Sequence, residues 1–268
     1  MIVYVKCNIS LFWRSIMSTR IMSAALVTAA LAVGASSASA AILSQNFEGD
    51  TPGGAPSGTL YTSGHIEVVD SSTNPVDPFA ASGNHSLLVE DNSDPNSANA
   101  VFSASGASTT GTFSFDFWST KDGTWTTPYF EVRIGNSTVQ NGSDLGVWFA
   151  FNNSGNIVNY GGQGTLDQTL THNASHTIVI NYDTSTDKWS GTLDNVPLTA
   201  GSGSITQFDF YTALASVQSF GFSAGYSTTT TVRGFVDNLL VVVPEPTTLS
   251  LLAVSAGLGL LRPRRRRI

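Results

Sequence analysis

The sequence predicts an all-β protein built as an antiparallel sandwich of two sheets. Short runs in the middle of the chain alternate apolar with polar residues, which is the period of a half-buried strand. Gly, Asn, Asp, Ser and Pro separate these runs, and residues 41–243 show no long helical period. Many short strands without helices between them are typical of two packed sheets, so residues 41–243 are predicted to form one β-sandwich domain.

Residues 17–40 predict a secretory signal peptide with an N-terminal signal helix. Arg20 precedes a short apolar core at Ala24–Val33, and small residues lead to a cleavage site between Ala40 and Ala41. An uncleaved membrane anchor is the alternative, but this apolar core is too short for it. Signal peptidase is therefore an expected partner during export.

Residues 1–16 form an extension upstream of this signal, and the true start is Met1 or Met17. The single cysteine, Cys7, lies in that extension. The mature chain is thus expected to contain no disulfide, no thiolate metal site and no catalytic thiol.

Several segments of the body carry the strand pattern, and Ser71–Ala81 between two of them is predicted as a surface loop. Three segments have the clearest alternation. Their apolar sets are Phe113, Phe115 and Phe117; Leu145, Val147, Phe149 and Phe151; and Ile178, Ile180 and Tyr182. Further strands are predicted at Leu87–Glu90, Tyr129–Ile134, Ile205–Tyr211, Val217–Ser223 and Val232–Val242.

The C-terminus has the pattern of a stop-transfer segment. Leu249–Leu261 is apolar or small throughout and predicts a transmembrane helix that is short for a hydrocarbon core of about 30 Å. Pro244 and Pro246 disfavour helix before it. Basic residues follow it and favour the cytoplasmic side. These are Arg262, Arg264, Arg265, Arg266 and Arg267.

This ending, "VPEP" followed by the apolar run and the arginines, resembles the PEP-CTERM sorting signal of Gram-negative bacteria. The resemblance covers residues 244–268, about the last tenth of the chain. It implies that an exosortase, a membrane protease-transpeptidase, recognises Pro244, Glu245 and Pro246 together with the arginine cluster. It further implies transient anchoring in the inner membrane, removal of the tail near the motif, and release to the cell surface or to an extracellular polysaccharide matrix.

The body between these two signals is acidic. Residues 41–243 contain four Lys or Arg residues and all but one of the 19 Asp and Glu residues, so their net charge is −14 against −7 for the whole chain. Such a surface repels nucleic acid and other polyanions. Calcium and neutral glycans are compatible ligands.

Three pieces of the body resemble concanavalin A-like and laminin-G-like jelly rolls and related carbohydrate-binding modules. The segment "SHTIVINYDTSTDKWSGTLDNVPL" resembles a hairpin of these folds, "LSQNFEGDTPGG" their first strand and "RGFVDNLLVV" their closing strand. The resemblance implies a jelly roll. It also implies a structural calcium between the first and last strands, with Glu48 and Asp237 as ligands. No other cofactor is expected.

Motifs for catalysis are scarce in this chain. There is no Gly-x-Ser-x-Gly elbow, no phosphate-binding loop and no Glu-x-Asp-x-x-Glu cluster of the kind that concanavalin-like glycosidases carry. His172 and His176 are four residues apart but flank a loop that enters a strand, which disfavours zinc. Because successive side chains of a strand point to opposite faces, Asp116 and Glu131 are expected on the face opposite the phenylalanines. On that face they could share a cleft with Arg133 and act as a catalytic pair. Solvated surface charges are the favoured interpretation.

Strand parity also places Trp118, Tyr129 and Trp148 on the side opposite the core. Sugar rings stack on exposed aromatic rings, and polar neighbours bind their hydroxyl groups. A glycan platform of these three residues is therefore one hypothesis, with Arg133, Asp116 and Glu131 as polar partners. The other is that loops or the second sheet cover the rings.

The sequence thus favours a non-catalytic, exosortase-processed protein that contacts extracellular polysaccharide. The first alternative is a polysaccharide hydrolase or lyase that uses the concave face of the sandwich. The second is a structural matrix protein without a small ligand.

Overall fold

The computed structural model describes residues 39–74, 78–79, 84–91, 97–119, 130–137, 142–152, 154–225 and 231–244. Ala40–Val243 form one compact unit. The signal helix, the C-terminal apolar segment and the arginine cluster predicted from the sequence lie outside the described residues, whereas Ala40 and Ala41 lie at the start of the first strand. Within the described ranges, no helix has the length and apolar character needed to span a membrane.

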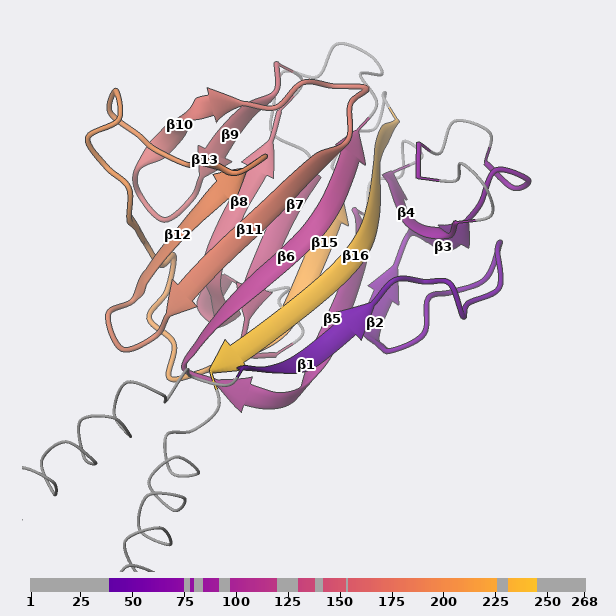
Figure 1. The fold of residues 1–268 in the computed structure, drawn as a ribbon, viewed down its shortest axis with the longest axis horizontal. Coiled ribbons are helices and arrows are strands. Elements are labelled where there is room, and N and C mark those ends of the chain that lie inside the picture. The colour runs from indigo at the N-terminus through magenta and orange to yellow at the C-terminus, as the bar shows by residue number, and fades with distance from the viewer. Residues whose placement is uncertain are drawn as a thin grey trace, which may run out of the picture. The chain divides into compact units, whose positions relative to one another are not determined.

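The unit is an antiparallel sandwich of two sheets, as the sequence predicts (Figure 1). The first sheet has nine strands: β1 (Ser39–Gln45), β3 (His65–Val69), β4 (Ser86–Asp91), β6 (Thr110–Ser119), β11 (His176–Asp183), β12 (Lys188–Leu193), β13 (Val196–Pro197), β14 (Phe208–Asp209) and β16 (Val232–Pro244). Its order is β13-β12-β11-β6-β16-β4-β3, with β1 paired to β16 and β14 to β12.

The second sheet has seven strands: β2 (Thr59–Ser63), β5 (Ala98–Ser108), β7 (Phe130–Gly135), β8 (Leu145–Phe151), β9 (Asn156–Asn159), β10 (Gly164–Thr169) and β15 (Val217–Ala224). Its order is β10-β9-β8-β7-β15-β5-β2. Among the described residues, one 3-10 turn, η1 (Gly142–Asp144), precedes β8.

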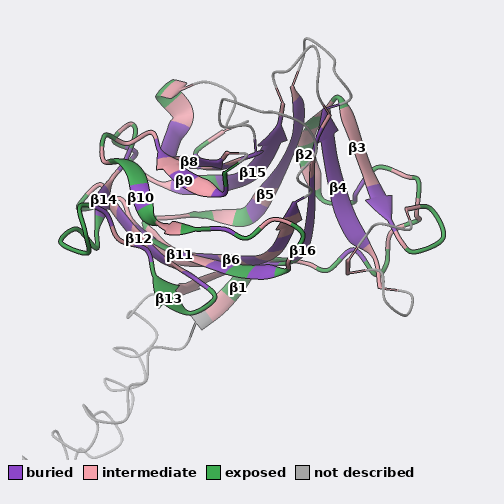
Figure 2. Cartoon of the chain, turned by 90° about the horizontal axis from the view of Figure 1, so that it is seen from above, coloured by how far each residue is buried: buried purple, intermediate pink, exposed green. Residues whose placement is uncertain are grey.

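The core lies between the two sheets and is rich in phenylalanine (Figure 2). Phe113 of β6 lies 4.9 Å from Phe220 of β15, and Phe117 lies 5.0 Å from Phe151 of β8, measured between ring centroids. Burying one such side chain contributes about 1.5–3 kcal/mol. The alternation of "GTFSFDFWS" therefore selects the inner face of β6, because its three phenylalanines are all fully buried.

Two sequence expectations are corrected by the register of the strands. Leu145 does not share the core face with Val147, because the β7–β8 pairing shifts between Ile134 and Gly135 and reverses the alternation there. Leu145 instead packs with Val101 on the outer face of the seven-stranded sheet. The strand expected at Ile205–Tyr211 shrinks to β14, which pairs with β12 through two residues alone.

The hairpin predicted in "SHTIVINYDTSTDKWSGTLDNVPL" is confirmed as β11 and β12. Asp183 pairs with Lys188 at its closed end. The turn between β12 and β13 has positive φ at both Asp194 (52°) and Asn195 (65°), which is the conformation that a two-residue hairpin turn requires. Asp and Asn tolerate this conformation better than most residues.

Candidate functional site

The structure does not bring the two predicted binding tryptophans together. Trp118 on β6 and Trp148 on β8 both point away from the core, as parity predicts, but they lie on different sheets and hence on opposite outer faces of the sandwich. The expectation of one platform containing both is therefore wrong. Arg133 lies on the face of Trp148, and Tyr129 lies outside the described residues.

The same geometry separates the proposed catalytic pair. Asp116 belongs to β6 of the nine-stranded sheet and Glu131 to β7 of the seven-stranded sheet. Side chains that face outward from opposite sheets have the whole core between them, since packed sheets are about 10 Å apart. Asp116 and Glu131 cannot share a cleft, and the expectation that they could is wrong.

Trp148 is the centre of an aromatic cluster on the outer face of the seven-stranded sheet. The indole lies 4.4 Å from the ring of Tyr160, just after β9, and 4.9 Å from the ring of Tyr211, just beyond β14. Backbone bonds fix both tyrosines, because Tyr160 N donates to Trp148 O (3.0 Å) and Tyr211 N to Gly146 O (2.7 Å). Trp148 and Tyr160 are half-buried, whereas Tyr211 is 44% exposed.

Arg133 supplies the polar side of this cluster. Its Nε donates to Glu131 Oε2 (2.8 Å), its Nη1 donates to Asn99 Oδ1 (3.2 Å), and its guanidinium carbon lies 5.8 Å from the Trp148 ring centre. Asn99 belongs to β5, so the side chain reaches across β15. Gly221 of β15 pairs with Arg133 and carries no side chain, which leaves room for this path.

The indole N–H of Trp148 is buried and, within the described part of the chain, has no hydrogen-bond partner. A buried donor without a partner costs about 1–3 kcal/mol. The indole N–H of the core residue Trp189 is in the same state, so a missing partner does not by itself distinguish Trp148 from a residue that serves packing.

Trp118 has a different environment on the opposite face. Its ring packs edge-on against Phe235 at 5.4 Å. Together they belong to a small hydrophobic cluster outside the main core, which also contains Val69, Leu88 and Phe79. Trp118 therefore covers buried apolar surface, as the alternative hypothesis of covered rings proposes.

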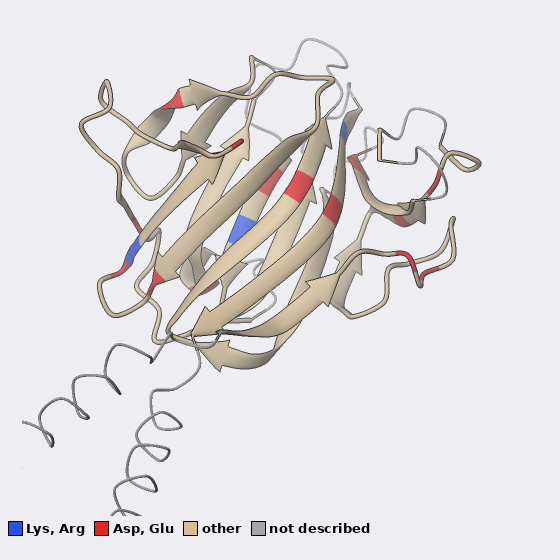
Figure 3. Ribbon diagram, viewed as in Figure 1, with Lys and Arg blue, Asp and Glu red and all other residues tan. Residues whose placement is uncertain are grey.

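Asp237 is a buried carboxylate on this same face, with 1% of its surface exposed. Asn84 Nδ2 donates to its Oδ2 (2.9 Å) and Asn238 N to its Oδ1 (2.7 Å). Burial, together with the negative charges of Asp116 and Glu48, raises its pKa to about 6, although these two hydrogen bonds act in the opposite direction. Asp116 is its direct partner in the β6–β16 register, so two acidic positions lie side by side (Figure 3).

Glu48 and Asp237, the predicted calcium ligands, thus lie close enough for their charges to interact. Glu48 Oε1 also accepts a hydrogen bond from His85 N (3.0 Å). Calcium takes six to eight oxygen ligands. Among the described residues no group of three or more His, Cys, Asp or Glu side chains is arranged to hold a metal ion. The calcium site stays a prediction, which the shared negative charge supports.

The two histidines considered for zinc have other partners. His172 Nδ1 lies 2.8 Å from Ser119 Oγ, and its Nε2 lies 3.2 Å from Asn152 O. His176 Nδ1 lies 2.6 Å from Asp194 Oδ2, and its Nε2 lies 2.8 Å from Thr171 O. Both rings therefore tie the loop between β10 and β11 to its surroundings.

Comparison with solved structures supports the two-sheet β-sandwich fold, whereas comparison of sequences finds no relative. No family model matches the sequence, and no curated protein sequence is recognisably similar. Among solved structures, a sialidase has a TM-score of 0.52 at 11% identity over 75% of this chain. The chain spans 18% of the length of that sialidase. Its likeness at this identity shows the fold alone.

Two further structures are similar. The carbohydrate esterase vb_24B_21 from the Shiga toxin-encoding bacteriophage phi24B has a TM-score of 0.48 at 13% identity over 78% of this chain and 100% of its own. Lectin II from Ulex europaeus has a TM-score of 0.47 at 13% identity over 75% of this chain and 98% of its own.

Proposed function

We propose that this chain is an exported protein that binds neutral extracellular polysaccharide through the Trp148 cluster, without catalysing a reaction. The observation that carries the proposal is the combination of three aromatic rings with an arginine–carboxylate pair on one outer face. Rings of this kind stack on the apolar C–H face of a sugar, and the neighbouring amide and charged groups bind its hydroxyls. The solved structures with a similar fold include a lectin, a sialidase and a carbohydrate esterase.

The electrostatics favour a neutral glycan over an acidic one. Arg133 and Glu131 form an ion pair, and their side chains are 15% and 14% exposed. The positive charge of Arg133 is thereby compensated inside the protein. The acidic body repels a polyanion as a whole.

The non-catalytic assignment is supported by the state of Glu131. Hydrolysis of a glycosidic bond uses two carboxyl groups about 5–9.5 Å apart. Glu131 is engaged by Arg133, and its expected partner Asp116 lies on the opposite face. A hydrolase or lyase is the alternative function, and reducing sugar or unsaturated product released from a bound polysaccharide would establish it.

Export and sorting belong to the same proposal. Strand β16 ends at Pro244, the first residue of the PEP motif, so an exosortase that cuts near Glu245 removes no residue of the sheet before Pro244. Mass spectrometry of the protein recovered from the cell surface tests this step. Recovery of the intact arginine cluster in the cytoplasm would contradict it.

A binding assay on a neutral-glycan array tests the central claim. Wild type is expected to bind, and Trp148→Ala is expected to bind at least ten times more weakly while keeping its strand circular dichroism. Trp118→Ala is the matched control, because it removes the same side chain from the opposite face. Equal loss in both variants, or no binding by wild type, would contradict the proposal, the latter pointing to a structural matrix role.

A further inference from the structure

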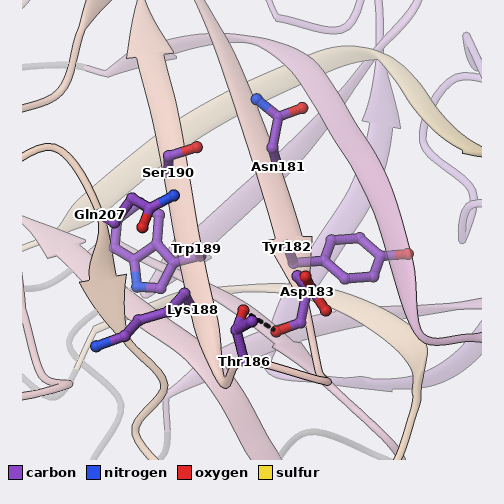
Figure 4. A pocket seen from close by; sticks show the side chains of 8 residues that line it. All are labelled: Asn181, Tyr182, Asp183, Thr186, Lys188, Trp189, Ser190 and Gln207. Carbon is purple, nitrogen blue, oxygen red and sulfur yellow. Dashed lines mark hydrogen bonds between the residues drawn. The ribbon is translucent and has the colours of Figure 1, made fainter.

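A recess of about 270 Å³ lies at the β11–β12 hairpin of the nine-stranded sheet (Figure 4). Trp148 belongs to the other sheet, so the recess and Trp148 lie on opposite sides of the sandwich. It is lined by Asn181, Tyr182, Asp183, Thr186, Lys188, Trp189, Ser190 and Gln207. The rings of Tyr182 and Trp189 are buried in the core, at 3% and 1% exposure. The recess therefore offers its ligand polar side chains instead of an aromatic platform.

The register of the strands arranges these side chains in two rows. Asn181 pairs with Ser190, and the pairing of Trp189 with Phe208 places Gln207 opposite Ser190 at the next position. Asp183 pairs with Lys188 in the second row. Neighbouring strands are about 5 Å apart, so polar groups repeat at roughly the width of one pyranose ring.

The hydrogen-bonding capacity of the first row is directed outward. Thr112 Oγ1 donates to Asn181 Oδ1 (2.8 Å), which leaves the Asn181 amide N–H groups to donate to a ligand. Ser190 and Gln207 make no side-chain hydrogen bond within the described ranges. Each of these two side chains can both donate and accept. Vicinal hydroxyl groups, which also donate and accept, are their complement.

The second row fixes the charge of the recess. Asp183 accepts hydrogen bonds from Ser185 N (2.8 Å) and Ser185 Oγ (2.6 Å), which hold its pKa below the usual value and keep it ionised. Lys188 forms an ion pair with Asp209. One carboxylate therefore remains in excess, and an anionic ligand is disfavoured.

We infer that this recess is a second glycan-contact site, which binds one neutral sugar unit through its vicinal hydroxyl groups. The volume supports a ligand of this size, because it lies just below the range of about 300–1,000 Å³ for drug-sized ligands. The inference rests on the proposed function. It adds a site of different chemistry, on the opposite face, which enables one molecule to hold two polysaccharide chains.

Amide NMR of the isotope-labelled full chain tests the site directly. The chain is kept in a detergent without a sugar headgroup, and the probes are the methyl glycosides of glucose, galactose and mannose. We expect one probe to shift the backbone signals of Asn181 and Ser190 saturably. The variant with Ser190→Val and Gln207→Leu should bind it at least ten times more weakly.

Thr192→Val is the matched control, because Thr192 is on the same strand and face but does not line the recess. It should bind like wild type, and Trp148→Ala should leave the Asn181 and Ser190 shifts unchanged. The second site is wrong if these shifts are absent for all probes or persist in the double variant. If shifts around Trp148 remain in that case, the proposed function stands alone. If they are absent too, the proposed function also fails.

Discussion

The two outer faces of the sandwich differ in what their tryptophans do. On the seven-stranded sheet, Trp148 lies with two tyrosines beside a compensated arginine, and the most exposed ring, Tyr211, lies open to solvent. On the nine-stranded sheet, Trp118 covers Phe235 and a small apolar cluster. Two residues of one type, both facing outward from their strands, therefore have different surroundings: Trp148 belongs to the proposed glycan site, whereas Trp118 covers apolar surface.

The largest expected effect concerns the cluster under Trp118. Phe235→Ala removes a ring with no exposed surface and should lower the free energy of unfolding by about 3–5 kcal/mol. Urea denaturation followed by fluorescence measures it. A loss below about 1 kcal/mol would mean that the nine-stranded face does not depend on this cluster, and the contrast between the faces would disappear.

A pH-dependent effect is expected at Asp237 on the same face. The folded state raises its pKa from 3.8 to about 6, so between these values the folded chain retains a proton that the unfolded chain has released. Stability therefore falls as the pH rises through this range. It stays about 3 kcal/mol lower above pH 6. Asp237→Asn removes the buried charge and should be more stable than wild type at pH 8. The expected gain is about 1–3 kcal/mol, because the loss of one hydrogen bond offsets part of it.

The control for this experiment is Asp183→Asn, which changes an exposed turn of the same sheet. Denaturation curves from pH 4 to pH 8 are expected to lose their slope for Asp237→Asn and keep it for Asp183→Asn. A slope that survives in Asp237→Asn would assign the pH dependence to another group.

Calcium sharpens the comparison further, because its predicted ligands Glu48 and Asp237 both belong to the nine-stranded side. Calcium at a hundredfold excess over its dissociation constant should raise stability by about 2.7 kcal/mol. The melting temperature of wild type should then fall on addition of a chelator, whereas that of Asp237→Asn should not. An unchanged wild-type melting temperature would rule out the calcium.

A smaller energy is expected for binding at the other face. Trp148→Ala should weaken glycan binding at least tenfold, which corresponds to about 1.4 kcal/mol. Isothermal titration with the array hit measures this value. A retained affinity would transfer the binding role to another surface, with the β11–β12 recess as the next to be tested.

The smallest effect is expected for Tyr211→Ser. Its ring is 44% exposed, so unfolding should change by no more than about 0.5 kcal/mol while glycan affinity falls severalfold. Val196→Ser is the control, because Val196 is 55% exposed on the nine-stranded sheet. Equal affinity of both variants would remove Tyr211 from the binding site.

The sequence predicts the fold class well because several strands show a clear alternation of apolar and polar residues. β6, β8 and β11 carry large apolar residues at alternate positions. β5 is missed, although it has 11 residues, because Ala and Ser dominate it and give little hydrophobic contrast. Its burial depends on neighbours that its own pattern does not specify.

The site was less predictable than the fold for a related reason. Parity states whether a side chain faces inward or outward, but not which sheet its strand joins. Trp118 and Trp148 were therefore assigned to one surface although β6 and β8 belong to different sheets. Tyr160 follows β9, the hairpin partner of β8, whereas Tyr211 lies far from Trp148 in sequence, and no local pattern marks Tyr211 as its neighbour.

The position of β16 has a consequence for how the chain reaches its native state. The last strand to be synthesised lies between β6 and β4 and also pairs with β1. The nine-stranded sheet is thus split into two halves until residues 232–244 arrive. Because such long-range pairings form slowly, the nascent chain stays open until its end has been delivered. A chain that lacks residues 232–244 is consequently expected to have no complete nine-stranded sheet.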